Sequence, residues 1–308
     1  MPKKVLRKSL RYLYRPLPFK APILKWLRGT GLSGMIPNRI KPFLVFKGVF
    51  EVCLEKTSFK MCHGYGHYIE AIVFWHGVDA FESSTMLCWK QLSTRSKYIF
   101  DIGANTGFYT LIAKSLNPSA EIHAFEPIRR IYSTLDKNIK LNSFSVPPAV
   151  LAHRLALSDY SGEGNMFDLP EDHNYTATLN RNLYAECDPP LESITEPAEV
   201  MRFDDFITKH DVAGCDLIKI DVESHEASVL RGMGDLLKFY RPTLIVEIWN
   251  NKVGSEAEEI LKDCGYLYFS LENSGPSPTQ HIRNNHPETG YINYLICTPA
   301  VAKDIGVV

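Results

Sequence analysis

Three side chains of the kinds that move protons follow one short apolar run. Asp221, Glu223 and His225 lie at the end of the predicted strand Leu217–Val222. Side chains alternate along an extended strand, so Asp221 and Glu223 should point to the same side. A positioned carboxylate or imidazole can take a proton from a reacting hydroxyl. The cluster could therefore supply a general base and the residue that orients it.

A second segment has the features of a ligand-binding turn. The chain from Tyr98 to Gly107 reads Tyr-Ile-Phe-Asp-Ile-Gly-Ala-Asn-Thr-Gly and leads into a helical pattern. Glycines let the backbone approach a ligand, and a helix N-terminus offers free N–H groups to an anion. Ala104 and Asn105 interrupt the G-x-G-x-x-G fingerprint, which argues against NAD or FAD. No Gly-Lys-Ser/Thr follows, so this turn is not a P-loop.

Glu126 adds a third element to this pattern. It follows the predicted strand Glu121–Phe125 and lies 23 residues after Gly103. An acid about 20 residues after such a turn commonly binds ribose hydroxyls. A carboxylate can accept hydrogen bonds from both neighbouring hydroxyls, and Pro127 favours a helix start directly afterwards. The turn and the acid together predict a cofactor that contains a nucleoside.

From Lys97 onward, apolar runs alternate with helical patterns, which is typical of a parallel sheet with crossover helices. Ligands bind at the carboxyl edge of such sheets, where the residues above would meet. The predicted strands are Tyr98–Ile102, Glu121–Phe125, Ala152–Leu157, Leu217–Val222, Leu244–Ile248, Leu267–Leu271 and Ile292–Cys297. The polar insertion at about residues 160–200 is long for a connection, so we expect it to carry a hairpin and to shape a substrate site.

The N-terminal part reads differently. Residues 3–15 form a predicted amphipathic helix with leucines on one side and Lys or Arg on the other. A short helix at about Ile23–Arg28, β-like runs over Phe43–Phe74 and a helix at about Phe81–Leu92 follow. We therefore predict a basic extension and small subdomain over residues 1–80 and a second domain over residues 81–308.

Four motifs together resemble the FkbM-type family of S-adenosylmethionine-dependent methyltransferases. They are Asp101–Gly107, Ala124–Pro127, Ala156–Asp159 and Ile218–Glu226, in the family's order and with its approximate spacing over about residues 80–250. The resemblance implies an α/β, Rossmann-like class I methyltransferase with helices on both faces of a seven-stranded, mostly parallel sheet. Its last strand would be antiparallel. The implied reaction is O-methylation of a hydroxyl on a sugar, glycan or secondary metabolite, with S-adenosyl-L-methionine as cofactor.

Matched position by position, the resemblance implies a cofactor site. In that site the glycine turn holds the methionine part, an acid binds the ribose, and two apolar residues flank the adenine. The residues are Asp101, Gly103, Asn105, Gly107, Glu126, Ala156 and Leu157. One position departs from the family pattern, because Ser224 stands where the family usually has glycine. The charged positions on either side of it are intact.

Methyl transfer from a sulfonium to an alcohol needs a base, because an alcohol is a poor nucleophile at neutral pH. We predict Asp221 as that base, His225 as the next candidate and Glu223 as the orienting residue. Two plainer interpretations stay open: His225 could be a helix residue bonded to a neighbour, and Asp221 could be a cap. Glu247 ends the predicted strand Leu244–Ile248, where it could face the cleft or pair with an arginine, and lies outside the predicted catalytic set.

No metal site is predicted. His63 and His67 have H-x-x-x-H spacing, but two intervening glycines make a helix unfavourable and no glutamate follows His63. Asp204 and Asp205 precede an apolar run and are more typical of a helix cap. The seven cysteines include no C-x-x-C, which favours free thiols in a reducing cytoplasm.

Charge is unevenly distributed along the 308 residues. Residues 1–50 contain twelve Lys or Arg and no acid, whereas the remainder contains 22 bases and 35 acids. Such a basic arm favours contact with an anionic surface. The helix over residues 3–15 would either lie on an anionic membrane or dock on the body with its basic face in solvent. We expect a cytoplasmic protein, with membrane contact on the cytoplasmic face in the first case.

The principal functional hypothesis is methylation of a small-molecule or glycan hydroxyl, with a lipid-linked acceptor as an extension of it. An RNA methyltransferase is the first alternative, but the acidic body disfavours nucleic acid. A non-catalytic adaptor is the second, and the acids at 101, 126 and 221 count against it because an idle pocket gives no reason to bury carboxylates. A Rossmann dehydrogenase would share the strand–turn–helix start but not the chemistry.

Overall fold

The computed structural model describes residues 19–38, 40–41, 44, 46–64, 68–169, 177–183, 192–272, 275–284 and 290–308. The chain divides into two compact units, residues 1–81 and residues 82–308, at one residue from the boundary that the sequence predicts. The predicted helix over residues 3–15, and His67, lie outside the described residues.

The N-terminal unit is built around an antiparallel hairpin of β1 (Gly48–Cys53) and β2 (Ser58–His63). This hairpin confirms the β-like pattern predicted for Phe43–Phe74 over residues 48–63, whereas the end of that range, from Tyr68, is helical and corrects the prediction. The helical elements of the unit are α2 (Lys20–Gly29), η1 (Leu32–Met35), α3 (Tyr68–His76) and η3 (Val78–Ala80). Aromatic rings form its core, where Phe50 and Phe74 pack edge to face and His63 stacks on Phe46.

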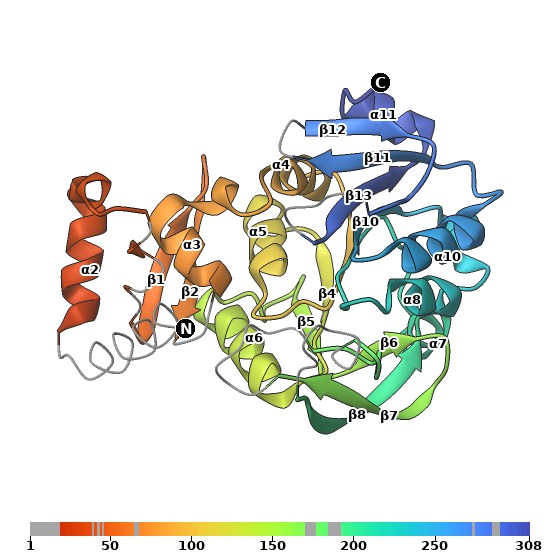
Figure 1. Cartoon of the computed structure of the whole chain (residues 1–308), viewed down its shortest axis with the longest axis horizontal. Helices are drawn as coiled ribbons and strands as arrows, with labels where there is room; N and C mark the ends of the chain where they lie inside the picture. The colour runs from red at the N-terminus through yellow and green to blue at the C-terminus, as the bar shows by residue number, and fades with distance from the viewer. Residues whose placement is uncertain are drawn as a thin grey trace. The chain divides into compact units, whose positions relative to one another are not determined.

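The second unit contains one eight-stranded sheet (Figure 1). Its strands, in spatial order, are β12 (Gly275–Thr279), β11 (Leu267–Glu272), β13 (Ile292–Cys297), β10 (Thr243–Ile248), β9 (Leu217–Ile220), β3 (Tyr98–Ile102), β4 (Glu121–Phe125) and β5 (Val150–His153). Neighbours from β10 to β5 are parallel, and β13 is antiparallel to both β10 and β11. Most residues of the parallel strands are apolar because helices cover both of their faces.

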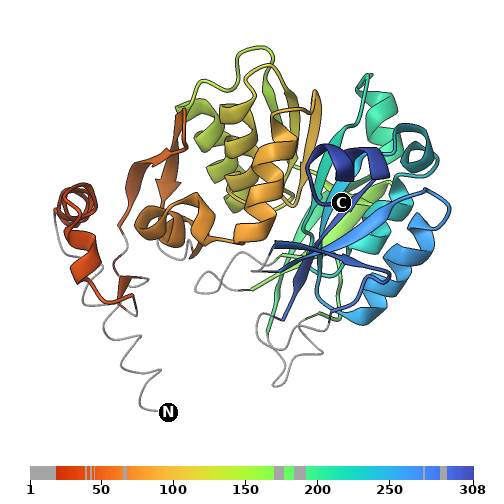
Figure 2. The ribbon, with the colours of Figure 1, turned by 90° about the horizontal axis from the view of Figure 1, so that it is seen from above.

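Those helices form two layers. Helices α4 (Ser83–Ser93), α5 (Phe108–Leu116) and α6 (Arg129–Leu141), orange to lime, lie on one side of the sheet (Figure 2). On the other side lie α7 (Phe203–Lys209), α8 (Glu226–Gly232) and α10 (Asn251–Leu261), teal to blue. Two short helices complete the unit, α9 (Leu236–Tyr240) and α11 (Pro299–Asp304). The predicted Rossmann-like arrangement with an antiparallel last strand is confirmed.

The predicted number of strands and two of the predicted strands need correction. The predicted sheet had seven strands, whereas the edge strand β12 is an eighth. It contains Pro276 and Pro278. An edge strand tolerates proline because one of its sides forms no hydrogen bonds to another strand. The predicted strand Ala152–Leu157 is instead two strands in different sheets, β5 and β6 (Ala156–Ser158). Strand β9 ends at Ile220 rather than at Val222, because the chain bends there.

The chain between β5 and β9 forms a separate three-stranded sheet, in the order β6, β8 (Ile194–Arg202), β7 (Gly162–Asp168). Strands β7 and β8 are antiparallel, which confirms the hairpin predicted within the insertion. Residues 170–176 and 184–191 of the insertion lie outside the described part.

Among the described residues, no helix combines the length and the apolar character that crossing a bilayer requires. The six cysteines in those residues are free. The sequence likewise predicts free thiols.

Candidate active site

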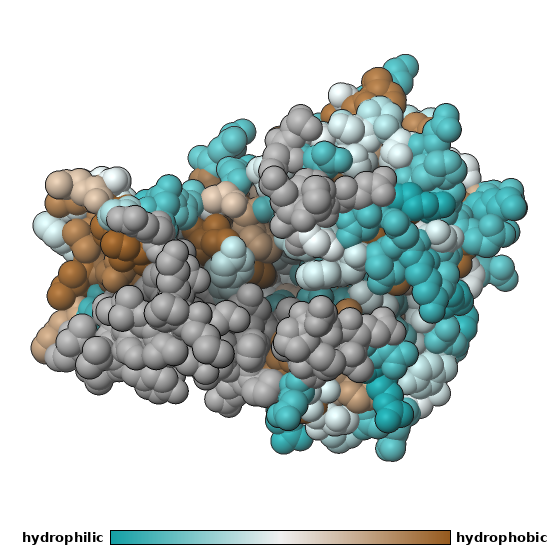
Figure 3. All heavy atoms as spheres, viewed as in Figure 1, coloured by the Kyte–Doolittle hydropathy of each residue, from teal (hydrophilic) through white to brown (hydrophobic). Residues whose placement is uncertain are grey.

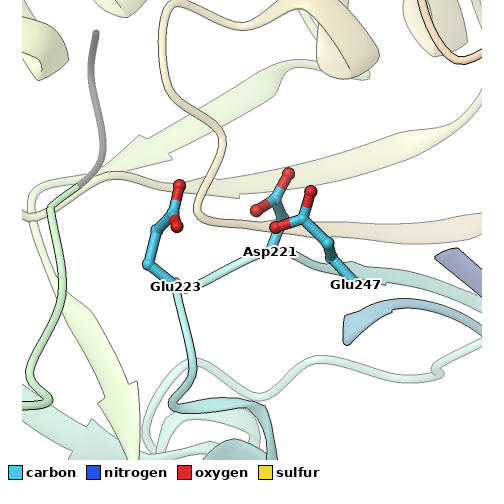
Figure 4. Close-up of side chains that lie close together, drawn as sticks. All are labelled: Asp221, Glu223 and Glu247. Atoms are coloured by element: carbon cyan, nitrogen blue, oxygen red, sulfur yellow. The ribbon is translucent and has the colours of Figure 1, made fainter. Parts of the chain in front are cut away.

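Three carboxylates meet at the carboxyl edge of the parallel strands. The oxygens of Asp221, Glu223 and Glu247 lie within 4.8 Å of one another (Figure 4). Sheet register explains the pairing of two of them: Ile220 lies opposite Val246, so the next residues along β9 and β10, Asp221 and Glu247, are neighbours. The cluster thus comes from two adjacent strands that end at one edge.

Glu223 reaches the cluster by a route that differs from the predicted one. The chain leaves the extended conformation after Ile220, and Glu223 and Ser224 both have left-handed backbone angles, with φ of 55° and 69°. The buried carboxylate of Glu226 accepts hydrogen bonds from the backbone N–H groups of Val222 (3.2 Å) and Ser224 (3.1 Å). This local capping of a tight bend, rather than strand alternation, brings Glu223 beside Asp221.

The bend also explains the departure at Ser224. Its φ of 69° is a conformation that glycine adopts freely and that costs other residues roughly 1–2 kcal/mol. Glycine in the family pattern relieves this strain, whereas serine retains it.

We expect Ser224→Gly to stabilise the protein by about 0.5–1 kcal/mol, because the relief of backbone strain exceeds the added chain entropy of the unfolded state. Thermal unfolding should shift upward by about 2 °C. Ser228→Gly, within helix α8, is the matched control and should lower the unfolding temperature. A Ser224→Gly variant that melts at or below the wild-type temperature would show that this bend is unstrained.

Lys219 neutralises part of the cluster. Its side chain is fully buried in β9, its Nζ lies 3.1 Å from Asp221 Oδ2, and it lies over the ring of Tyr109. Burial alone would lower the pKa of this ammonium, but the carboxylates of Asp221, Glu82 and Glu247 outweigh that effect and raise it. Lys219 is therefore charged at neutral pH.

Glu82, the residue before α4, forms a second layer beside Lys219. Its carboxylate accepts hydrogen bonds from the hydroxyl of Tyr109 (2.5 Å), the amide of Asn293 (2.8 Å) and the hydroxyl of Tyr291 (3.3 Å). Asn293 lies directly opposite Glu247 in the sheet register. Residues at the starts of α4 and α5 and in strands β9, β10 and β13 thus contribute to one polar network.

Too few positive charges accompany these acids for all of them to ionise easily. Burial raises the pKa of Glu223 and Glu247 well above the ordinary value, and repulsion from Asp221 raises both further. The indole of Trp249 donates a hydrogen bond to Glu247. Simultaneous ionisation of Glu223 and Glu247 is therefore disfavoured, which suits a site that exchanges protons with a substrate.

The same three carboxylates are the one group of possible metal ligands found among the described residues. Carboxylate oxygens suit Mg²⁺ or Ca²⁺. However, Lys219 already supplies a positive charge beside Asp221. The prediction that no metal is bound therefore stays a prediction.

His225 does not join the carboxylates. It lies at the N-terminal boundary of α8, and its Nε2 is 2.8 Å from the hydroxyl oxygen of Ser158. Burial lowers its pKa, an effect that Asp159 partly offsets. This placement corresponds to the plainer of the two interpretations, a helix-end histidine bonded to a neighbour.

The glycine turn lies against the bend that follows β9 at Asp221–Ser224. Gly103 has φ of 81°, and a Cβ there would lie 1.8 Å from the backbone oxygen of Asp221. Gly107 has φ of 93°, and a Cβ there would lie 2.7 Å from the Leu135 side chain. Glycine at 103 is thus needed for the close approach of β3 and β9, which puts the cofactor turn next to Asp221.

Glu126 connects β4 to this turn. Its carboxylate accepts hydrogen bonds from the backbone N–H groups of Asn105 (3.1 Å) and Ile128 (2.9 Å). Asn105 in turn has a left-handed backbone, and its side chain accepts a bond from the Thr106 N–H group. Glu126 thus fixes the turn, and its remaining lone pairs could still accept ribose hydroxyls.

Burial raises the pKa of Glu126 to about 8 from 4.5, although the two backbone N–H bonds oppose the shift. The folded state then binds this proton more tightly than the unfolded state, so stability should fall as pH rises from 4.5 to about 8.

Between pH 6.5 and 8, Glu126→Gln should flatten the decline by up to about 1.4 kcal/mol per pH unit, because the histidines are common to both proteins and their titration cancels in the comparison. Denaturant unfolding at several pH values measures the slope. Equal slopes for the variant and the wild type would contradict a buried, proton-binding Glu126.

The other predicted cofactor residues have mainly structural contacts. Asp101 is buried and accepts bonds from the N–H group (3.0 Å) and hydroxyl (2.5 Å) of Thr110, so it ties β3 to α5. Burial raises its pKa to about 6. Ala156 and Leu157 are buried in β6, where Ala156 packs with Ile128, two residues after Glu126. Their predicted contacts with a cofactor stay predictions.

Sequence reasoning missed several members of this network. Lys219 could have been found, because a lysine in the apolar run Leu217–Ile220 must be buried and needs a counter-charge. Glu247 was recognised as a residue that could face the cleft but was left outside the predicted catalytic set, although β10 is the parallel neighbour of β9. Glu82, Tyr291 and Asn293 are distant in sequence and gave no local signal.

The parallel sheet, the glycine turn and the acids at the strand ends define a class I methyltransferase. The sequence profile described as "Methyltransferase FkbM domain" matches residues 101–268, more than half of the chain. The chain therefore belongs to the FkbM methyltransferase family.

Individual relatives are distant. Methyltransferase sdnD of Sordaria araneosa is 28% identical over 191 residues, which cover 55% of this chain and 73% of the relative. The 31-O-demethyl-FK506 methyltransferase FkbM of Streptomyces tacrolimicus is 30% identical, with 44% of this chain and 59% of the relative covered. The hexuronic acid methyltransferase AglP of Haloferax volcanii is 28% identical, with 56% and 64% covered.

Proposed function

We propose that this protein is an S-adenosylmethionine-dependent O-methyltransferase that acts on a hydroxyl of a glycan or a secondary metabolite. The observation that carries the proposal is the position of the carboxylate cluster. Asp221, Glu223 and Glu247 lie at the carboxyl edge of the sheet, and the backbone of Asp221 touches Gly103 of the cofactor turn. A hydroxyl near Asp221 would thus lie close to a group bound at that turn.

The residues at the turn fit S-adenosylmethionine. Gly103 has no side chain, so the turn lies directly against the backbone of Asp221, and Glu126 is a buried acid with acceptor capacity next to the turn. Ala156 and Leu157 offer an apolar surface for a flat base. When bound, this cofactor supplies an electrophilic methyl group on a sulfonium.

In this proposal Asp221 takes the proton of the acceptor hydroxyl as the oxygen attacks. Lys219 holds Asp221 through the 3.1 Å ion pair and so fixes the direction in which its free oxygen points. Glu223 and Glu247 can share the proton afterwards, because their raised pKa values favour the protonated form. Such positioned proton transfer typically contributes about 10²- to 10⁴-fold to a rate.

The acceptor class is supported by the relatives. One relative is named a 31-O-demethyl-FK506 methyltransferase, and another is named a hexuronic acid methyltransferase. A saturated hydroxyl needs a base, which the carboxylate cluster offers.

The proposal is tested by incubating the protein with S-adenosylmethionine labelled in its methyl group and panels of hydroxylated metabolites and uronic acid-containing glycans. We expect the label to appear as a methyl ether that survives mild alkali. A label released by alkali would identify a methyl ester and would contradict a hydroxyl acceptor.

A further inference from the structure

Large apolar side chains are exposed along the first described segment of the chain. Of the fourteen such side chains exposed in the described residues, six lie between residues 19 and 40. They are Phe19, Ile23, Trp26, Leu32, Met35 and Ile40. Figure 3 shows hydrophobic residues gathered over the N-terminal unit, at the left of the view. Single exposed apolar residues are ordinary, but a concentrated group marks an interaction surface.

Three of these side chains form an apolar stripe at the start and along one side of α2. Ile23 and Trp26 lie within about 60° of each other on one side of the helix, and Phe19 directly precedes it. Their exposed fractions are 77%, 53% and 59%, so more than half of each of these side chains is open to solvent.

The other side of α2 holds the helix on its own unit. Leu24 is buried, and the guanidinium of Arg28 lies over the rings of Phe50 and Phe74 and donates to the backbone oxygen of Glu51. The apolar stripe is therefore on the outer face of a fixed helix. Because η1 follows directly, the exposed Met35 extends the apolar surface beyond α2.

The charge around this surface points to the chemistry of its partner. Residues 1–50 contain twelve Lys or Arg and no Asp or Glu. Basic residues beside exposed Trp, Phe and Ile are the composition of a segment that lies in the interface of an anionic bilayer, where rings enter the headgroup region and bases meet lipid phosphates.

We propose that residues 19–40 form a docking surface for the anionic face of a lipid bilayer, with Phe19, Ile23 and Trp26 inserted among the headgroups. Nucleic acid fits less well, because residues 51–308 carry 22 bases against 35 acids and the stripe is aliphatic as well as aromatic. A bilayer-bound chain would meet a lipid-linked acceptor at the cytoplasmic face, but the docking surface itself does not depend on the proposed function.

Sedimentation of the full chain with vesicles tests this surface. Phosphatidylcholine vesicles that contain phosphatidylglycerol should bind the protein, and phosphatidylcholine alone should bind it far more weakly. The double substitution Ile23→Ser and Trp26→Ser should reduce binding by at least about 10-fold, since two inserted side chains are lost. Phe239→Ser is the matched control, because Phe239 is 76% exposed in the second unit, and should bind like the wild type.

Tryptophan fluorescence gives a second readout in a variant that keeps its shape. Brominated lipids should quench the emission of Trp26, and Trp26→Phe should lose most of the quenching while binding is retained. Trp75 and Trp89 are buried, and the half-buried Trp249 belongs to the second unit, outside the proposed docking surface.

Three results would overturn the proposal: vesicle binding that survives the double substitution, preferential binding of RNA, or a dimer in solution that the double substitution dissociates. Methyl transfer to a water-soluble acceptor should be the same for both serine variants. Failure of the docking surface is therefore distinct from failure of the proposed activity.

Discussion

Replacing Asp221 by asparagine should reduce the rate constant of methyl transfer by about 10³-fold. Asparagine has nearly the same shape and can still accept a hydrogen bond from Lys219, which lies 3.1 Å from Asp221 Oδ2. It cannot take the proton of the acceptor hydroxyl. Affinity for S-adenosylmethionine should change little, because the Gly103 contact involves the backbone of Asp221 and not its side chain.

The measurement is single-turnover transfer at saturating cofactor. Asp136→Asn is the matched control, because Asp136 forms an exposed ion pair with Lys140 on α6, and this change should leave the rate within about two-fold. His225→Gln should have a smaller effect than Asp221→Asn, since His225 is bonded to Ser158. If His225→Gln abolished transfer while Asp221→Asn preserved it, the assignment of the base would be wrong.

Replacing Lys219 by methionine should destabilise the protein by about 3–5 kcal/mol. Methionine fills a similar volume, so the loss comes from the charge. Burial raises the pKa values of Glu82 and Glu247, and the charge of Lys219 opposes that effect. Without Lys219, these two carboxylates and Asp221 would repel one another without its compensating charge. For a domain of this size the unfolding temperature should fall by roughly 10 °C.

Acid pH distinguishes a charge effect from a packing effect. The pKa values of Glu82 and Glu247 are raised by burial in the wild type, so both take up protons readily as pH falls. The loss in Lys219→Met should therefore shrink toward pH 5. The exposed ion pair of Lys140 makes Lys140→Met the control, with a loss of about 0.5 kcal/mol or less. A loss that is equally large at pH 5 and pH 8 would point to packing alone.

Local patterns predicted the strands and the turns around the site well. The strands Tyr98–Ile102, Glu121–Phe125 and Ile292–Cys297 have the predicted bounds, because each is an apolar run with a clear break at both ends. The edge strand Gly275–Thr279 was missed since its two prolines oppose strand formation. What favours this strand is its contact with neighbouring elements, which the local sequence alone does not reveal.

The site itself depends on contacts that no local pattern contains. Asp221 and Glu223 were identified from one motif, but their neighbour Glu247 comes from an adjacent strand. Glu82 reaches the site from the residue before α4, more than 130 positions from Lys219. The sequence predicted that glycine at 103 lets a ligand approach the backbone. The structure adds a second role, because glycine at this position also allows contact with the Asp221 backbone.

Calorimetric titration with S-adenosylmethionine tests the central claim most directly, because cofactor binding at the glycine turn underlies every step proposed for Asp221. We predict saturable binding of one molecule per chain, and a loss of at least about 10-fold in affinity for Glu126→Ala, which removes the acid beside the turn. Circular dichroism would establish that the variant is folded. Absence of binding by the wild type, both alone and with acceptor present, would contradict the account.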